Sequence, residues 1–199
     1  MSEADKEKWD AKYRSATHPS FAPSKVLESV VDYLPSTGSA IDLAGGVGRH
    51  SIWLAQRGLD VTLADVSPVA LAIASDEANA KGVPISMLEI DLESQSFPAG
   101  PWDVVLSALY LNRALWVSAA ENLSIGGILI VLQPTINNLQ RHPKPPRRFL
   151  LEERELCGLA CGLEIIDYRE GWLEDGRHDA LLVGRKPRSN ISNPVLDVE

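Results

Sequence analysis

A glycine-rich turn between two short apolar segments is the feature that most limits what this chain can fold into. The first segment, residues 40–44, runs directly into Gly45, Gly46 and Gly48. The second, residues 60–65, ends in Asp65, 19 residues after Gly46. This order is typical of a nucleotide-type binding site: a strand, a tight glycine turn, a helix, and an acid at the end of the next strand. Glycine lets the backbone approach a ligand closely, and the carboxylate can accept hydrogen bonds from both ribose hydroxyls.

Strand-like and helix-like segments alternate along the rest of the chain. Apolar runs predict strands at 40–44, 60–65, 85–90, 102–107, 128–132, 163–169 and 179–186, and helical periodicity predicts helices at 25–34, 48–57, 68–81, 113–123 and 151–161. Ser67-Pro68 is a strong helix start, and Gly82 a natural stop. We therefore expect an α/β fold: a doubly wound, Rossmann-like, mostly parallel seven-stranded sheet with helices on both faces and its last strand antiparallel.

Polar and small residues gather where these predicted strands end. Asp42, Gly46, Asp65, Asp91 and Ser107 all fall at or near carboxyl ends of strands. Ligands of such sheets bind at that edge, where the strand order reverses. The convergence of these residues predicts a binding crevice there. For the acids taken singly, other interpretations stay open: Asp42 could orient the turn, Asp65 could be a solvent-exposed strand-end acid, and Asp91 could form a turn.

Length and charge narrow the class of protein. At 199 residues the chain suits one domain, which we place at residues 1–187, with a flexible tail at 188–199. The net charge of −8 is a poor match for nucleic acid or an anionic membrane surface. No apolar run reaches the roughly 18 residues needed to cross a bilayer. The charged N-terminus lacks the apolar core of a secretory signal, so we expect a cytoplasmic location.

The two cysteines and the acidic residue of the fourth strand predict no further chemistry. Cys157 and Cys161 have neither zinc-site nor disulfide-framework spacing, so we read them as core residues and expect no metal. Asp103, at the start of the fourth strand, is expected to be structural.

The turn does not match the better-known nucleotide motifs. A dinucleotide fingerprint that starts at Gly46 and Gly48 would need a third glycine where Ser51 stands, and no P-loop ending is present. The pattern acid-x-small-x-Gly-x-Gly instead resembles motif I of class I S-adenosylmethionine-dependent methyltransferases. The resemblance implies S-adenosylmethionine as cofactor and S-adenosylhomocysteine as product. It also implies that Asp65 holds the ribose, that Asp91 faces the adenine amino group, and that residues 107–110 line the methyl-transfer pocket.

The cofactor-binding set that this resemblance implies is Asp42, Ala44, Gly45, Gly46, Gly48, Asp65, Val66, Asp91, Leu92 and Ser107. Acidic residues suit a cofactor that carries an ammonium and a sulfonium rather than a pyrophosphate. Ala44 departs from the family, where many members have glycine. Alanine is tolerable there only if the backbone keeps a negative φ, which we therefore expect.

Further segments resemble the tellurite-resistance and thiopurine methyltransferase-like branch. They include Trp9-Asp10-x-Lys12-Tyr13-Arg14, Gly48-Arg49-His50 and Asp65-Val66-Ser67-Pro68. The branch implies that residues of about 3–24 form a helical lid over the cofactor. Alternatively, Trp9 and Tyr13, four residues apart, only fasten the N-terminal helix to the core.

The function implied is methyl transfer to a small-molecule acceptor. No residue stands out as a general base, which favours a soft or already anionic nucleophile such as a thiol or a selenium or tellurium oxyanion. Candidates for the acceptor pocket are Tyr13, Arg14, Tyr110 and Arg113. The basic stretch 141–148 is either a solvated loop or a guide for an anionic substrate, and His50 either a helix-surface residue or a proton acceptor.

Two other functions remain open on the sequence. One is a nicotinamide-dependent oxidoreductase, and the other a non-catalytic S-adenosylmethionine-binding protein. The short chain favours a compact acceptor, and we expect a monomer or a weak homodimer with no nucleic-acid or membrane partner.

Overall fold

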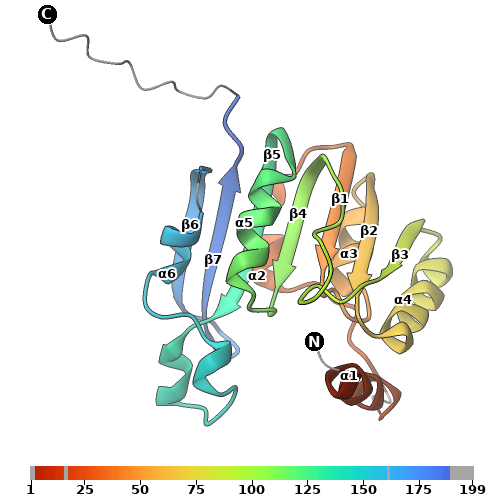
Figure 1. The fold of residues 1–199 in the computed structure, drawn as a ribbon, viewed down its shortest axis with the longest axis horizontal. Coiled ribbons are helices and arrows are strands. Elements are labelled where there is room, and N and C mark those ends of the chain that lie inside the picture. The colour runs from red at the N-terminus through yellow and green to blue at the C-terminus, as the bar shows by residue number, and fades with distance from the viewer. Residues whose placement is uncertain (1–2, 16–17, 161, 189–199) are drawn as a thin grey trace, which may run out of the picture.

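A seven-stranded sheet forms the centre of the molecule, in the order β3-β2-β1-β4-β5-β7-β6 (Figure 1). The computed structural model describes residues 3–15, 18–160 and 162–188; the tail predicted at 188–199 lies almost entirely outside them. The strands are β1 Gly38–Leu43, β2 Leu59–Asp65, β3 Ile85–Glu89, β4 Trp102–Ala108, β5 Leu123–Pro134, β6 Glu164–Trp172 and β7 His178–Arg185.

The sheet is parallel except at one edge. Strands β3, β2, β1, β4 and β5 run parallel to their neighbours, whereas β7 is antiparallel to both β5 and β6. The predicted α/β class, the strand number and the antiparallel last strand are therefore confirmed. Because β1 lies between β2 and β4, the order reverses at β1, and a binding site expected at such a reversal would lie beside the carboxyl end of β1.

Two helix layers cover the sheet. The helices are α1 Glu3–Ser15, α2 Lys25–Glu28, α3 Arg49–Ala55, α4 Pro68–Lys81, α5 Arg113–Glu121 and α6 Glu155–Leu159, with short 3-10 turns at Val31–Tyr33, Ile136–Gln140 and Arg147–Phe149. On one face, Leu27 of α2 and Leu54 of α3 pack against strand residues such as Val104. On the other, Trp116 of α5 and Leu156 of α6 pack against strand residues such as Ile41. Helix α4 covers the β2–β3 edge.

The sequence signals for α4 are confirmed, both at its start and at its end. The hydroxyl of Ser67 accepts a hydrogen bond from the backbone N–H of Ala70, at 3.1 Å, and Pro68 occupies the first helical position. Gly82 ends the helix in the left-handed conformation, with φ of +67°. Tertiary contacts are not needed to explain either end.

Two predicted helices are much shorter than expected. The helix predicted at 25–34 ends at Glu28, where the Ser29 hydroxyl bonds the carbonyl of Val26 and the backbone turns into a 3-10 segment. The helix predicted at 151–161 begins only at Glu155. Its first part is taken by the sheet, since Leu151 N donates to the carbonyl of Pro134, at 3.0 Å, and Arg154 adopts a left-handed φ of +57°.

Substitution of Gly82 can measure how much free energy a left-handed backbone conformation costs a residue other than glycine. No heavy atom lies within 4 Å of the position that a Cβ would take there, so Gly82→Ala adds backbone strain without a clash. We expect it to lower the free energy of unfolding by about 1 kcal/mol. Gly158→Ala, inside α6 and also without a clash, should change stability in the opposite direction by roughly 0.5–1 kcal/mol. Urea denaturation of both variants tests the pair, and equal effects would contradict it.

Candidate functional site

The glycine turn links β1 to α3 through alternating left-handed residues. Ala44, Gly46 and Gly48 have φ values of +53°, +58° and +79°. The expectation that Ala44 keeps a negative φ is therefore wrong. The fold imposes the left-handed conformation at this position whatever residue stands there, and alanine bears a strain of about 1–2 kcal/mol. Strain of this kind concentrates at sites where the backbone shape is needed for a ligand.

Close packing explains why two of the turn residues are glycine. A Cβ at Gly45 would lie 2.3 Å from a methyl of Leu63 and 2.6 Å from a carboxylate oxygen of Asp42. A Cβ at Gly46 would lie 2.6 Å from the hydroxyl of Tyr13. The Cβ position of Gly45 is thus filled by side chains beneath the turn, and that of Gly46 by Tyr13 of the N-terminal helix, so a ligand can reach the Gly46 backbone only if Tyr13 moves.

Asp65, at the carboxyl end of β2, holds the turn in place. One carboxylate oxygen accepts the N–H of Gly46 at 2.8 Å, and the other accepts the N–H of Ser67 at 2.9 Å. The carboxylate is buried, so the alternative that Asp65 is a solvent-exposed strand-end acid is wrong. Burial raises its pKa, while these backbone hydrogen bonds oppose the shift. Each oxygen keeps a second lone pair for a ligand hydroxyl, so its contact with ribose remains a prediction.

Asp42 lies beneath the same turn and is 1% exposed. One oxygen accepts a hydrogen bond from the hydroxyl of Ser51 at 2.7 Å, and the other has no partner among the described residues. Burial raises the pKa of Asp42 to about 7, helped by the charge of Asp65 and opposed by the hydrogen bond from Ser51. A buried carboxylate with an unsatisfied oxygen is suited to a cationic group nearby.

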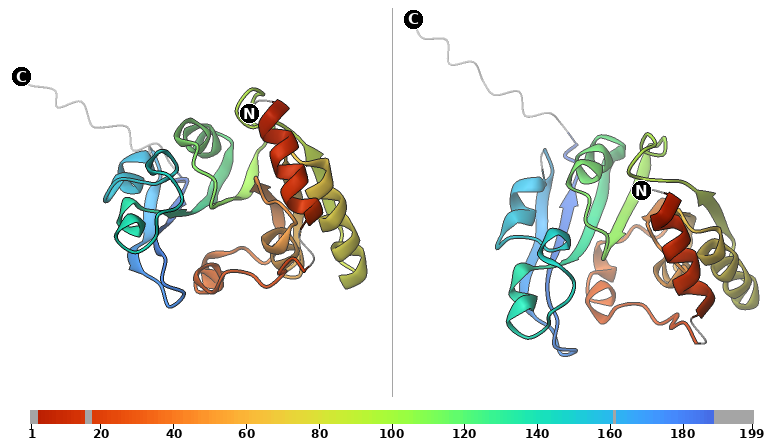
Figure 2. Two further views of the ribbon diagram at one scale, coloured as in Figure 1. Left: turned by 90° about the horizontal axis from the view of Figure 1, so that it is seen from below. Right: turned by 60° about the horizontal axis from the view of Figure 1, so that its bottom comes forward.

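Helix α1 lies across the turn and alongside α4 (Figure 2). The hydroxyl of Ser67, which caps α4, donates to the carboxylate of Asp10, and Lys6 pairs with Glu89 at the end of β3. Trp9 and Tyr13 stack with ring centroids 5.9 Å apart, as their spacing predicts. Tyr13 is half-buried, and its pKa is raised by this burial and by the charge of Asp65. The structure thus brings one acceptor-pocket candidate, Tyr13, directly to Gly46.

Tyr110 is the second candidate that lies near the crevice. Burial raises the pKa of Tyr110 to about 12; a hydrogen bond with Asn112 opposes the shift, and the charges of Glu93, Asp91 and Asp65 add to it. It follows Leu109, which is 40% exposed and has a left-handed φ of +63°. The strained backbone after β4 turns this segment toward the carboxyl edge.

Three predicted cofactor residues have mainly internal partners. Ser107 is buried, and its hydroxyl accepts a hydrogen bond from the indole N–H of Trp116 at 3.0 Å, so it pairs with a group of the core. Leu92 is also part of that core. Asp91 accepts the N–H of Glu93 at 3.0 Å and the hydroxyl of Ser94 at 2.8 Å, which agrees with a turn-forming residue. Their contacts with a cofactor, like that of the buried Val66, remain predictions.

Other candidate side chains are directed away from the turn. Arg113 makes a two-point ion pair with Glu155 of α6, and Arg14 is largely exposed beside Asp10. His50 is 4% exposed, so the expectation of a helix-surface residue is wrong. Burial lowers the pKa of His50 to about 3, aided by the charge of Arg49, which makes it a weak proton acceptor near neutral pH.

Asp103 is structural, as expected. Its carboxylate accepts hydrogen bonds from the N–H of Ser39, at 2.8 Å, and from its hydroxyl, at 3.2 Å, tying β4 to β1 at the edge away from the turn. Among the described residues no cluster of three or more His, Cys, Asp or Glu could hold a metal. No described helix has both the length and the apolar character to cross a membrane.

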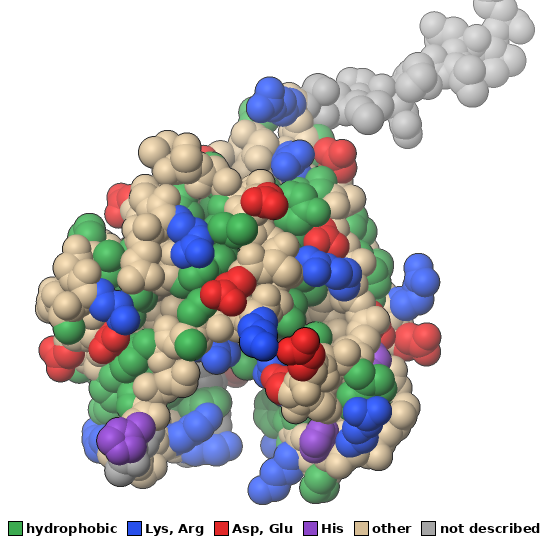
Figure 3. Space-filling view, turned by 180° about the vertical axis from the view of Figure 1, so that it is seen from behind, with side chains coloured by type: hydrophobic (Ala, Val, Ile, Leu, Met, Phe, Trp, Pro, Cys, Tyr) green, Lys and Arg blue, Asp and Glu red, His purple; other side chains and the backbone are tan. Residues whose placement is uncertain are grey.

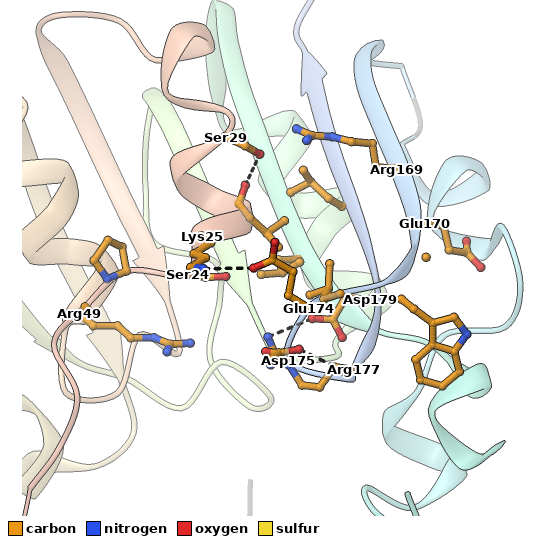
Figure 4. Close-up of a pocket in the computed structure, with 18 of the residues that line it drawn as sticks. Ser24, Lys25, Ser29, Arg49, Arg169, Glu170, Glu174, Asp175, Arg177 and Asp179 are labelled. Atoms are coloured by element: carbon orange, nitrogen blue, oxygen red, sulfur yellow. Dashed lines mark hydrogen bonds and ion pairs between the residues drawn. The ribbon is translucent and has the colours of Figure 1, made fainter. Parts of the chain in front are cut away.

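A cavity of about 930 Å³ lies on the α2 face, near the carboxyl edge of the sheet. Its walls come from residues within 20–29 and within 169–181, together with Arg49 and Leu132. Viewed from behind, the lower edge of the molecule is hollowed, with Lys and Arg side chains around the hollow (Figure 3). The close-up shows Arg49 and Arg177 pointing into the same space from opposite sides (Figure 4). Sequence reasoning missed this cavity because its walls are more than 100 residues apart.

The basic stretch 141–148 is not simply solvated. The guanidinium of Arg141 lies over the ring of Trp172, 3.7 Å from its centroid, and the imidazole of His142 contacts the carbonyl of Gly176 at 3.0 Å. Trp172 also lines the cavity. The segment that follows β5 therefore supports the wall formed by the β6–β7 hairpin.

Comparison with known proteins agrees with this geometry. Residues 40–125 match the family model described as a methyltransferase domain. Demethylmenaquinone methyltransferase from Thermus thermophilus is 35% identical over 114 residues, which cover 54% of this chain and 48% of that protein. The chain thus spans about half the length of this curated relative.

Solved structures share the fold over almost the whole chain. One, described as the conversion of a disulfide bond into a thioacetal group during echinomycin biosynthesis, has a TM-score of 0.73 at 20% identity and covers 94% of this chain and 95% of its own. TehB from Haemophilus influenzae has a TM-score of 0.68 at 21% identity, covering 91% of this chain and 66% of its own. These similarities show that the chain has a Rossmann-like fold, within which residues 40–125 match a methyltransferase domain.

The strain at Ala44 makes a testable prediction. Ala44→Gly removes the left-handed penalty of a Cβ, partly offset by the greater freedom of glycine in the unfolded chain. We expect the free energy of unfolding to rise by up to about 1 kcal/mol. Ala40→Gly, in the same strand and fully buried, has no such strain and should be destabilising. Loss of stability in both variants by similar amounts would show that Ala44 is unstrained.

The buried carboxyl of Asp42 predicts a pH dependence. Its pKa rises from an ordinary 3.8 to about 7, so the folded state binds the proton more tightly. The stabilisation from this proton is complete below pH 4 and is lost as the pH rises through 7. Asp42→Asn, which can still accept the hydrogen bond from Ser51, should exceed the parent protein in stability by about 2–4 kcal/mol at pH 8. The difference should shrink towards pH 5.

Chemical denaturation at pH 5, 6, 7 and 8 measures that difference. Asp103→Asn is the matched control, because hydrogen bonds from Ser39 lower the pKa of Asp103 and give the opposite sign. A stability difference for Asp42→Asn that does not vary with pH would contradict the assignment.

Proposed function

We propose that this protein transfers a methyl group from S-adenosylmethionine to a small-molecule acceptor. The observation that carries the proposal is the glycine turn, which has no side chain at Gly45 and Gly46, is fixed by Asp65 and is backed by the buried Asp42 at the reversal of strand order. The match of residues 40–125 to a methyltransferase domain supports it.

The residues of the turn suit this cofactor. Asp65 would accept the ribose hydroxyls with its remaining lone pairs, and Val66 and Leu92 would flank the adenine next to Asp91. Asp42 supplies a buried negative charge, with one unsatisfied oxygen, for the positive groups of the methionine portion. When bound, the cofactor supplies a methyl group already activated by its sulfonium. The chain therefore mainly has to align the acceptor and exclude water.

Helix α1 is proposed to act as the lid. The hydroxyl of Tyr13 lies within 2.6 Å of the place where a Cβ of Gly46 would be, so α1 or this side chain must shift when a ligand enters. Polar contacts between described residues help to hold α1 near the turn: the carboxylate of Asp10 accepts a hydrogen bond from the Ser67 hydroxyl, and Lys6 pairs with Glu89. Such contacts can open without disturbing the core.

The acceptor is proposed to be a soft or already anionic nucleophile. His50 is held neutral and buried, and Tyr13 and Tyr110 keep their protons because their pKa values are raised. None of these three side chains is a good base near neutral pH. A thiolate or an oxyanion needs no such base.

Cofactor titration tests the proposal. S-adenosylhomocysteine should bind in calorimetry and NADH should not, because Ser51 bonds Asp42 where a dinucleotide fingerprint would place its third glycine. Asp65→Ala should weaken S-adenosylhomocysteine binding by roughly 1–3 kcal/mol, the range for a lost hydrogen bond to a charged group. Gly46→Val should abolish it by filling the crevice.

Asp103→Ala is the control for general loss of stability. This substitution removes a half-buried carboxylate at the opposite end of the same sheet and should leave the affinity for S-adenosylhomocysteine unchanged. Binding of NADH in place of S-adenosylhomocysteine would support an oxidoreductase instead. Cofactor binding without turnover on thiols, selenite, tellurite or organic anions would support a non-catalytic binding protein.

A further inference from the structure

The Lys and Arg side chains that line the 930 Å³ cavity are paired with carboxylates, with one exception among the described residues. Lys25 pairs with Glu174 at 3.1 Å, and Arg169 pairs with Asp167 at 2.7 Å. Arg177 is held by Asp175 at 3.1 Å and by Asp179 at 3.3 Å. Arg49 forms no hydrogen bond or ion pair between its side chain and any part of the chain that the structure describes.

Arg49 also faces a like charge. Burial lowers its pKa, and the charge of Arg177 across the cavity lowers it further (Figure 4). The carboxylate of Asp42 partly compensates from beneath the turn, but its bonded oxygen is already taken by Ser51. A partly buried guanidinium without a counter-ion, set opposite another guanidinium, is stabilised by an anion placed between them.

The second guanidinium is held in a fixed position. Asp179 is 3% exposed and accepts no hydrogen bond from the residues that the structure describes, and its charge holds Arg177 through an ion pair. Asp179 is thus a positioning residue, since it orients a group that would touch the ligand. Arg49 begins α3 directly after Gly48, so it joins the cavity to the glycine turn.

The remaining lining decides which kind of anion fits. Leu132, Leu181 and Trp172 give the cavity an apolar part. A four-atom oxyanion such as selenite needs on the order of 100 Å³, judged by the share of liquid volume that one water takes. A cavity of about 930 Å³ lies at the upper end of the range for whole organic ligands.

We propose that this cavity is the acceptor site and that it takes an organic anion, with its carboxylate or phosphate on Arg49 and Arg177 and its apolar body on Leu132, Leu181 and Trp172. The role of the cavity as an acceptor site rests on the proposed function, but its binding of an anion can be tested without the cofactor. The proposal places the acceptor in a class other than the metalloid oxyanions.

Calorimetric titration of the full chain with four probes tests the proposal: benzoate, phenylphosphate, benzyl alcohol and selenite. Benzoate or phenylphosphate should bind at least 10-fold more tightly than benzyl alcohol, which has the same body without the charge, and than selenite, which has charge without the body. Binding of selenite as tight as that of both organic anions would overturn the substrate class. Equal binding of benzyl alcohol would overturn the role of charge.

Substitutions locate the anion. Arg49→Gln should weaken the better organic anion by about 10- to 100-fold, the range for a lost charge-assisted hydrogen bond. Arg49→Lys should retain part of the affinity. Arg57→Gln is the matched control, because it removes the same charge just beyond the other end of α3, where Arg57 lies over Trp53. Unchanged affinity in a folded Arg49→Gln variant, or an equal loss in Arg57→Gln, would overturn the site.

Failure of this proposal and failure of the proposed function can be told apart. A separate titration of the parent protein with S-adenosylhomocysteine decides the function. Bound S-adenosylhomocysteine with no anion binding would overturn only the acceptor site. Anion binding that depends on Arg49, without any binding of S-adenosylhomocysteine, would support the anion site and overturn its role in methyl transfer.

Discussion

The pair of hydrogen bonds accepted by Asp65 is the interaction on which the rest of the crevice depends. By binding the N–H groups of Gly46 and Ser67, one carboxylate joins the end of β1, the end of β2 and the start of α4. These three segments meet at the point where strand order reverses. The charge is buried and offset by backbone dipoles, so the turn keeps one shape. That fixed shape is what allows a ligand to be met by backbone rather than by flexible side chains.

Two structural features follow from that shape. Ala44 is forced into a left-handed conformation, and Tyr13 can lie against the turn because Gly46 carries no side chain. Both are departures from what each residue prefers alone: backbone strain for Ala44, and for Tyr13 a hydroxyl packed against backbone. Departures of this kind are expected at functional sites, where local preferences give way to the ligand.

The parts of the fold that sequence could predict are those with local causes. The cap at Ser67, the stop at Gly82 and the apolar strands each depend on residues within a few positions. The parts that sequence could not predict depend on distant partners. Leu151 leaves its expected helix because Pro134 and Ile136 bind its backbone, and β5 extends to Leu123–Pro134 because it pairs with strands on both sides.

The same distinction holds for the site. The glycine turn and Asp65 are close in sequence and could be predicted, whereas the cavity joins Arg49 to a hairpin more than 100 residues away. Nothing near Arg177 or Asp179 in the sequence indicates that they face α3. His50 follows the same distinction: local sequence predicts its place on a helix, but its burial depends on the surrounding fold.

The contact of Arg141 with Trp172 links the segment after β5 to the wall of the cavity and not to the glycine turn. The excursion after β5 supports the hairpin wall from outside, through Arg141 and His142, and no described hydrogen bond or ion pair joins it to the glycine turn. Insertions or exchanges in that excursion would therefore reshape the cavity while the nucleotide-type crevice stays as it is. Related proteins with this arrangement could therefore differ in the ligands that they bind while the sheet and the glycine turn keep their stability.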